Sequence, residues 1–453
     1  MKRSEHRHIG RVDRDPVALL AGTDAGRVER LVPLKYGRML ASPFAFFRGS
    51  AVLQAHDLAT TPHTGVQHTI CGDAHLMNFG AFGTPERQLA FDLNDFDETH
   101  PGPWEWDLKR LVASLKLAAR HLGLSAAEGD DAVSVAALAY EYHTRRLAQT
   151  DALTQWREMV TLDALYEATR DTAARARLQK AIQKAQRRSH EELLPKLGNQ
   201  ADGRWTLRDA PPALFHIHSE QSLFSSADDW MRLGHWTELT DHLYNGYVAQ
   251  LRPDTQAMLA RFEMQDLAFK VVGVGSVGTR CLVLLLTDGT GAPLMLQIKQ
   301  ANPSVLAAYV PGRPDATTGH QGERVVTGQQ LLQASSDRFL GATTGPAGRH
   351  FYVRQLRDMK LSAEVETFDA ALLTRYSALC GRVLARAHAK AGGSAAVVSA
   401  YLGKGEAFAD ALVRYAHAYA NQVEQDYAVF REACHSGRVV AQTDADMAAD
   451  FSV

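Results

Sequence analysis

The chain has 453 residues, of which 45% are hydrophobic and 22% are charged, and its formal net charge is −2. This composition indicates a globular protein long enough for two or three domains or lobes, and it argues against a disordered chain. The charge gives no reason to expect binding to nucleic acid or to a membrane surface. The longest apolar runs, such as residues 281–286, are too short to span a bilayer.

The four cysteines are scattered and form no Cys-x-x-Cys pair. This favours buried thiols in a reducing cytoplasm over a zinc ribbon or a disulfide scaffold. The N-terminal sequence MKRSEHRHIGRVDRD lacks the apolar stretch of a secretory signal. We expect residues 1 to about 11 to form a basic, loosely attached tail in which His6 and His8 are not metal ligands. The last residues, rich in Asp and Ala, are expected to fray. We therefore expect a cytoplasmic protein, and the sequence leaves its oligomeric state open.

Acidic and amide side chains gather between residues 69 and 107, in TICGDAHLMNFG and, after a connector, in LAFDLNDFDETHPGPWEWD. Two short apolar runs, 66–71 and 89–93, are bounded by Gly and Asp and predict buried strands. The polar side chains at the ends of these runs are Asp73, Asn78, Asp92, Asp95 and Asp97. One Asp can accept a hydroxyl proton while an Asn and another Asp hold Mg²⁺ against nucleotide phosphates. The segment therefore predicts a Mg²⁺-dependent phosphoryl-transfer site.

A glycine-rich segment lies in DLAFKVVGVGSVGTRCLVLLL, residues 266–286. Two β-type runs are joined there by Gly273, Gly275, Ser276 and Gly278. The spacing GxGxxG suits a dinucleotide fold only when a helix follows the glycines. A strand follows here, which is typical of a kinase glycine-rich loop that covers the phosphates with its backbone N–H groups.

The strand after this hairpin ends in Ile-Lys299, like the kinase strand whose lysine contacts the phosphates. Glu323, in the next predicted helix, is expected to hold Lys299. Arg280 stands where the kinase pattern prefers Val, which is a departure from that pattern. Arg48, in ASPFAFFRGSA, has two interpretations that the sequence leaves open. It either pairs with a carboxylate in the core or binds a phosphate with its planar guanidinium group.

GDAHLMN resembles the catalytic loop of the aminoglycoside-phosphotransferase branch of the protein-kinase-like superfamily, which has Asp, then His two positions on, then Asn five positions on. The resemblance implies that Asp73 is the catalytic base, that His75 orders the loop and that Asn78 binds the metal. The blocks NDFDE and WEWDL are similar to the metal-binding block of that branch and its later Asp-Leu pair. That match implies that Asp95 is the metal ligand, with Asp92 or Asp97 as alternatives. It also implies that Asp107 is the buried residue that braces the loop.

Most of the chain also resembles an uncharacterised family of bacterial proteins with a domain of unknown function. The blocks that carry this resemblance are LVPLKYGRMLASPFAFFRGSA, CGDAHLMNFG and FDLNDFDETHPGPWEWDLKRL. It implies no established activity.

Together these segments predict an α+β, two-lobed protein-kinase-like fold with a β-rich small lobe and a mainly helical large lobe. The catalytic loop precedes the glycine segment here, whereas kinases have the reverse order, so we expect a circular permutation. The predicted parts are an N-terminal helical extension (1–60), the large lobe with the catalytic loop (61–260), the small lobe (261–360) and C-terminal helices that complete the large lobe (361–453).

The predicted function is that of an ATP- and Mg²⁺-dependent phosphotransferase acting on a small hydroxylated molecule, in a pocket supplied by the helices of residues 110–250. Nucleotidyl transfer remains open, because the same groups serve both reactions. One alternative is a metal-dependent phosphohydrolase using His68, Asp73, His75, Asp92, Asp95 and Asp97. Another is a non-catalytic nucleotide-binding pseudokinase.

Overall fold

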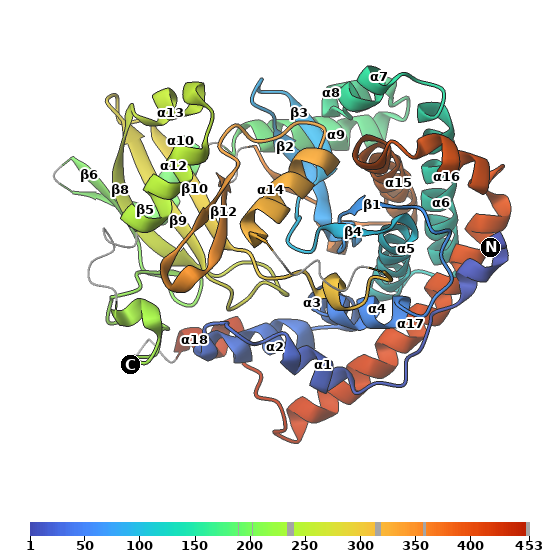
Figure 1. Cartoon of the computed structure of the whole chain (residues 1–453), viewed down its shortest axis with the longest axis horizontal. Coiled ribbons are helices and arrows are strands. Elements are labelled where there is room, and N and C mark those ends of the chain that lie inside the picture. Colours follow the sequence, from blue (N-terminus) through green and yellow to red (C-terminus); the bar gives the residue numbers. More distant parts are fainter. Residues whose placement is uncertain (189, 202, 233–239, 313–318, 357–358, 450–453) are drawn as a thin grey trace.

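The computed structural model describes residues 1–188, 190–201, 203–232, 240–312, 319–356 and 359–449, which form an α+β protein (Figure 1). The α-helices are α1 (Pro16–Gly22), α2 (Val32–Leu40), α3 (Pro43–Gly49), α4 (Ala51–Leu58), α5 (Trp104–His121), α6 (Ala126–Leu147), α7 (Ala152–Arg157), α8 (Leu162–Ala168), α9 (Thr172–Gln186), α10 (His190–Leu197), α12 (Gly246–Gln250), α13 (Pro253–Leu259), α14 (Gln321–Leu332), α15 (Ala370–Gly392), α16 (Ala395–Leu402), α17 (Glu406–His435) and α18 (Asp444–Ala449). The strands are β1 (Gln67–Ile70), β2 (Phe79–Gly83), β3 (Leu89–Leu93), β4 (His100–Pro103), β5 (Gly198–Ala201), β6 (Arg204–Leu207), β7 (Leu214–Phe215), β8 (Phe262–Lys270), β9 (Cys281–Asp288), β10 (Pro293–Gln300), β11 (Gly341–Thr344), β12 (His350–Gln355) and β13 (Leu361–Ser362).

A six-stranded antiparallel sheet, in the order β11-β12-β10-β9-β8-β7, forms one side of the molecule (Figure 1). Its central strand β9 is apolar at consecutive positions because both of its faces are covered. Leu282 and Leu284 enter one core cluster, while Val283 and Leu285 enter another. The sheet also takes in β7, which lies outside the segment 261–360 predicted to form the small lobe.

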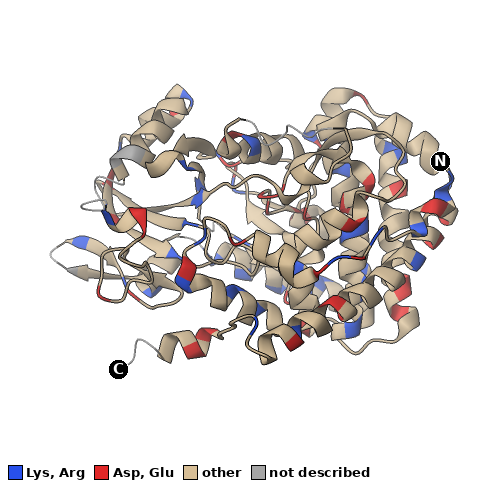
Figure 2. Cartoon of the chain, turned by 60° about the horizontal axis from the view of Figure 1, so that its bottom comes forward, with Lys and Arg blue, Asp and Glu red and all other residues tan. Residues whose placement is uncertain are grey.

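The long helices α5, α6, α15 and α17 form the opposite side of the molecule and enclose its largest core cluster (Figure 1). Trp104 at the start of α5 stacks on Tyr140 of α6 with ring centroids 5.5 Å apart. A capping box starts α6, since Ser125 and Glu128 bond to each other's backbone N–H. Figure 2 shows Lys and Arg interspersed with Asp and Glu over both sides of the molecule, consistent with the near-zero net charge.

Two small sheets, β1-β4 and β13-β2-β3, lie between the six-stranded sheet and the long helices (Figure 1). The predicted strands 66–71 and 89–93 are confirmed as β1 and β3. Antiparallel pairing of β2 with β3 sets Phe79 opposite Leu93. This register brings the end of the predicted catalytic loop beside the predicted metal-binding block.

Both ends of the described chain are more ordered than the sequence suggested. The prediction of a loosely attached N-terminal tail is wrong, because residues 3–7 form a 3₁₀ helix in which the His6 ring is fully buried. His6 packs edge-on against Phe408 and bonds to Tyr401 Oη, and burial lowers its pKa to about 3. The expected fraying of the last residues is also wrong as far as residue 449, since Met447 of α18 is buried in the core. Among the described helices, none is both long and apolar enough to cross a membrane.

Candidate active site

The loop that follows β1 is held from below by Asp107 in the first turn of α5. Asp107 is fully buried, and its two oxygens accept hydrogen bonds from Cys71 N at 2.7 Å and Gly72 N at 2.8 Å. Gly72 has φ +82°, and a Cβ there would lie 2.2 Å from the Glu98 carbonyl oxygen, so only glycine fits. Asp107 therefore fixes the backbone of the loop from within the core.

Asp73, the predicted base, is the first side chain after this turn and lines a cavity. Its Oδ1 accepts a 2.7 Å hydrogen bond from Arg110 Nε, and its side chain stays 19% exposed. Burial raises the pKa of Asp73, and Arg110 opposes that shift only in part. Arg110 is itself fixed by Gln54 Oε1 and the Phe47 carbonyl oxygen, so the carboxylate is held by a rigid partner.

His75 is buried beside this pair, with Nε2 3.8 Å from Asp73 Oδ2. Burial, helped by Arg110 and Arg48, lowers the pKa of His75 well below its ordinary value, so the ring is neutral. Its backbone carbonyl accepts from Asn78 N at 2.8 Å, and its own N–H donates to the Asp73 carbonyl at 2.8 Å. His75 thus shapes the loop and carries no charge near Asp73.

Asn78 donates its side-chain amide to the Asp73 carbonyl at 2.6 Å, which leaves its amide oxygen available. The backbone carbonyl of Asn78 accepts a 2.9 Å hydrogen bond from Asn94 N. Asp95 follows Asn94 in the chain, so this bond brings Asp95 to the same site. Asn78 and Asp95 line one cavity together, and the Asp95 side chain is 35% exposed. Two such oxygens suit Mg²⁺, which usually binds one or two protein ligands plus water and phosphate oxygens.

The two alternative metal ligands are occupied by protein partners. Asp92 is 1% exposed, forms an ion pair with Arg386 and accepts Ala334 N at 2.7 Å. Asp97 forms an ion pair with Lys299 and accepts from Tyr352 Oη at 2.8 Å. Burial acts to raise the pKa of Asp97, but these donors outweigh it and hold the pKa below its usual range. Of the three Asp residues of this block, Asp95 is therefore the one most open to a cation.

Lys299 on β10 is buried, and its Nζ lies 4.0 Å from Asp95 Oδ2 as well as against Asp97. Burial acts to lower the pKa of Lys299, but these two carboxylates raise it well above its ordinary value. The expected contact with Glu323 is not formed. Glu323 is exposed at the start of α14, and Asp95 and Asp97 are the carboxylates that reach Lys299 among the described residues. The next residue, Arg324, faces inward and donates to the Asp97 carbonyl.

The glycine segment connects β8 to β9, so the predicted strand–glycines–strand order is confirmed. Gly273 and Gly278 have φ +69° and +84°, which glycine adopts without strain. Ser276 donates to Asp97 Oδ2 at 3.2 Å. A Cβ on Gly275 would lie 3.5 Å from the Arg48 carbonyl oxygen, so the segment packs on the end of α3. Arg280 is buried away from this site, where it pairs with Asp228.

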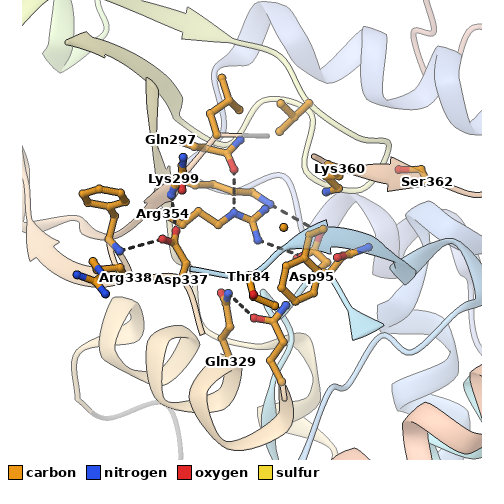
Figure 3. A pocket seen from close by; sticks show the side chains of 18 of the residues that line it. Thr84, Asp95, Gln297, Lys299, Gln329, Asp337, Arg338, Arg354, Lys360 and Ser362 are labelled. Atoms are coloured by element: carbon orange, nitrogen blue, oxygen red, sulfur yellow. Dashed lines mark hydrogen bonds and ion pairs between the residues drawn. The ribbon is translucent and has the colours of Figure 1, made fainter. Parts of the chain in front are cut away.

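Two adjoining cavities meet at these residues. The larger, about 730 Å³, lies under the glycine segment and is lined by Lys299, Arg354, Leu356 and Phe82 among others (Figure 3). The smaller, about 320 Å³, is lined by the catalytic loop and the N-terminal helices. The residues common to both linings are Arg48, Asp95 and Ser276.

Several residues of this site were missed by the sequence interpretation. They are Arg110, Tyr352, Arg354, Gln297 and Arg324. Arg110 lies one helical turn after Asp107, so its presence on the same face could have been inferred from that spacing. The positions of Tyr352 and Arg354 follow from the pairing of β10 with β12, which no local signal gives.

His68, proposed as a ligand of a two-metal site, packs its ring 4.7 Å from that of His388 and donates from Nδ1 to the Thr69 carbonyl oxygen. Within the part of the chain that the structure describes, no group of three or more His, Cys, Asp or Glu is arranged to hold a metal ion.

The family comparison matches residues 27–433 to a family described as "uncharacterized protein conserved in bacteria (DUF2252)", and the chain belongs to that family. No curated protein and no solved structure gives a significant match.

Proposed function

We propose that this member of the bacterial family is a Mg²⁺- and ATP-dependent phosphotransferase with a two-lobed, circularly permuted kinase-like fold. One observation carries the proposal. Lys299, beside the glycine segment, and Asp95, beside the catalytic loop, lie 4.0 Å apart although they are far apart in the sequence. Phosphoryl transfer needs such a convergence of a cation, an acidic metal ligand and a base, since its catalysis is mostly positioning and electrostatics.

In this proposal ATP occupies the larger cavity. Its phosphates lie under the glycine segment and point toward Lys299 and Asp95. The amide oxygen of Asn78 and a carboxylate oxygen of Asp95 would hold Mg²⁺, which neutralises charge on the phosphates. Lys299 takes the role predicted for it, but Asp97 holds it in place of Glu323. Tyr352 and Ser276 fix Asp97 in turn, so the lysine is supported by three side chains.

The acceptor hydroxyl would lie in the smaller cavity, against Asp73. The bond between the γ-phosphorus and its bridging oxygen breaks, a bond from phosphorus to the acceptor oxygen forms, and the hydroxyl proton passes to Asp73. The raised pKa of Asp73 suits a group that must take a proton late in the reaction. Its geometry, fixed by Arg110, favours positioning of the hydroxyl over strong deprotonation.

The acceptor cavity differs from the expectation that helices of residues 110–250 would supply it. Its lining instead comes from the N-terminal segment, the catalytic loop, the glycine segment and the residues after β10. Gly22 and Thr23 follow α1, and Ala51 and Val52 begin α4. A volume of about 320 Å³ suits a small molecule and not a folded protein. Glu98, whose pKa burial raises to about 7, adds a carboxyl group to this cavity.

The chain order supports a permutation of the kinase-like arrangement. Asp73, Asn78 and Asp95 precede the glycine segment and Lys299, yet all of them border two adjoining cavities. The pseudokinase alternative is disfavoured because Asp73, Asn78 and Asp95 are all present with oxygens open to a cavity. Nucleotidyl transfer uses the same groups, and an isotopic label on the α- or γ-phosphate of ATP distinguishes it from phosphoryl transfer.

The test is consumption of Mg-ATP by the wild type, Asp73→Ala and Asp95→Ala in bacterial metabolite extracts. ATP labelled at the γ-phosphate should give a labelled small molecule, whereas transfer of label only from the α-phosphate would indicate nucleotidyl transfer. Asp95→Ala should weaken Mg-nucleotide binding, and Asp73→Ala should keep binding and lose transfer. Equal turnover by all three proteins would remove both assignments.

A further inference from the structure

Arg48, near the end of α3, lies where the two cavities meet and belongs to both linings. It forms no hydrogen bond or ion pair with any described residue, and its Nε is buried without a partner. Arg48 as a whole is half-buried, and its Nε–H is the donor that lies away from water without a partner, which costs free energy. A side chain in this state is suited to an anion that arrives only with the substrate.

The backbone around Arg48 is fixed from three directions. Ser42 caps the start of α3 by accepting Ala45 N at 3.0 Å. The carbonyl of Phe47 accepts from Arg110 Nη2 at 2.7 Å, and Arg110 holds Asp73. On the other side, Gly275 of the glycine segment packs against the Arg48 carbonyl. The position of Arg48 is thus coupled to both the base and the phosphate-covering loop.

Three neighbouring cations of the two cavities, Lys299, Arg354 and Arg27, are already paired. Lys299 is held by Asp97, and Arg354 donates to Gln297 Oε1 and to the Asn94 carbonyl, each at 3.0 Å (Figure 3). Arg27 donates to the Thr23 and Val277 carbonyls. Arg48 contrasts with these three, because its side chain lies near Asp73 without bonding to a carboxylate.

We propose that Arg48 is a catalytic residue that binds the phosphoryl group in transit between the two cavities. This rests on the proposed function. The transferred group carries its charge on three equatorial oxygens, while the bond to the nucleotide breaks and the bond to the acceptor oxygen forms. A guanidinium group at the junction can donate to those oxygens when the phosphorus lies between donor and acceptor. It gains little from a nucleotide that has not begun to react, so its effect falls on the transition state.

The experiment measures binding of Mg-ADP with and without aluminium fluoride, which mimics the phosphoryl group in transit and needs no known acceptor. The wild type should bind Mg-ADP at least about tenfold more tightly when aluminium fluoride is present. Arg48→Gln should lose most of that gain and keep its affinity for Mg-ADP alone within about threefold. Arg48→Lys should recover only part of the gain, because an ammonium group lacks the planar fork. Arg145→Gln, which removes an exposed arginine on α6, is the matched control and should behave as the wild type.

The outcomes separate this inference from the function on which it rests. A wild type that does not bind Mg-ADP contradicts the phosphotransferase itself. A wild type that binds Mg-ADP and gains nothing from aluminium fluoride overturns the role of Arg48, since there is then no stabilisation for it to supply. The role is also overturned if Arg48→Gln keeps the full gain, or loses affinity for Mg-ADP and for the aluminium fluoride complex equally. Soluble, folded Arg48→Gln protein is verified by its circular dichroism spectrum and its melting temperature.

Discussion

Lys299 Nζ lies 4.0 Å from Asp95 Oδ2. This contact joins the six-stranded sheet to the loop after β3. Asp97 forms an ion pair with the same lysine. Arg354 also lies close enough to interact electrostatically with both carboxylates. The Asp95 side chain is 35% exposed, so it is the carboxylate of this group that a divalent cation can reach most easily. The resemblance implied Asp95 as the metal ligand with Asp92 or Asp97 as alternatives, and the structure pairs Asp92 with Arg386 and Asp97 with Lys299.

Replacing Asp97 and Glu323 should separate the observed partner of Lys299 from the expected one. Asp97→Asn removes the charge that Lys299, Tyr352 and Ser276 surround, so we expect weaker Mg-ATP binding. Glu323→Gln should leave binding unchanged, because this side chain is exposed. Isothermal titration of Mg-ATP into both variants measures the difference. Weaker binding by Glu323→Gln alone would restore the kinase-like pair.

Asp92→Asn should destabilise the fold and leave the site chemistry intact. Asp92 and Arg386 are both 1% exposed, and removing one partner of a buried ion pair typically costs about 3–5 kcal/mol. The measurement is urea unfolding followed by circular dichroism. Glu424→Gln breaks a half-exposed pair with Arg120 and serves as the control, for which we expect about 1 kcal/mol or less. A stable Asp92→Asn protein that loses Mg²⁺ binding would instead make Asp92 the metal ligand.

Activity should rise with pH through the pKa of Asp73. A base must be ionised to accept a proton, and burial raises the pKa of this carboxyl above the ordinary value for aspartate. The acid limb of the pH profile of kcat should therefore lie at higher pH than an ordinary aspartate would give. Asp73→Asn should abolish this limb together with turnover while keeping the affinity for Mg-ATP. A profile identical in wild type and Asp73→Asn would exclude Asp73 as the base.

Arg110→Met should move that acid limb further upward. Arg110 lowers the pKa of Asp73, so its removal raises the pH at which the carboxyl ionises. Titration of activity against pH tests this shift, and Mg-ATP affinity should change little because Arg110 lines neither cavity. An unshifted profile with reduced kcat would show that Arg110 acts only through the position of α3.

The sequence predicted those parts of the fold and site that depend on local patterns. The continuous apolar runs gave β3 and β9, and the glycine segment between two strands was placed correctly. The loop from Asp73 to Asn78 is also local, since its backbone bonds link residues a few positions apart. Such patterns can be read because the side chains and turns that define them are neighbours in the chain.

Features set by distant packing were not accessible in this way. Glu323 was assigned to Lys299 from chain order, but the rotation of α14 turns Arg324 inward and leaves Glu323 in solvent. Tyr352 lies opposite Lys299 only through the register of β10 and β12. In the sequence, His6 belongs to a charged segment that predicts a tail. Its burial depends on packing against Trp104 and Phe408, which are distant in the chain.

The most direct measurement of the central claim is isothermal titration of ATP into the wild-type protein with and without Mg²⁺, repeated with Asp95→Ala. The account predicts one nucleotide bound per chain, tighter with Mg²⁺ than without it, and loss of that magnesium dependence in Asp95→Ala. A wild-type protein that takes up no ATP, or that binds it equally with and without Mg²⁺, would contradict the account.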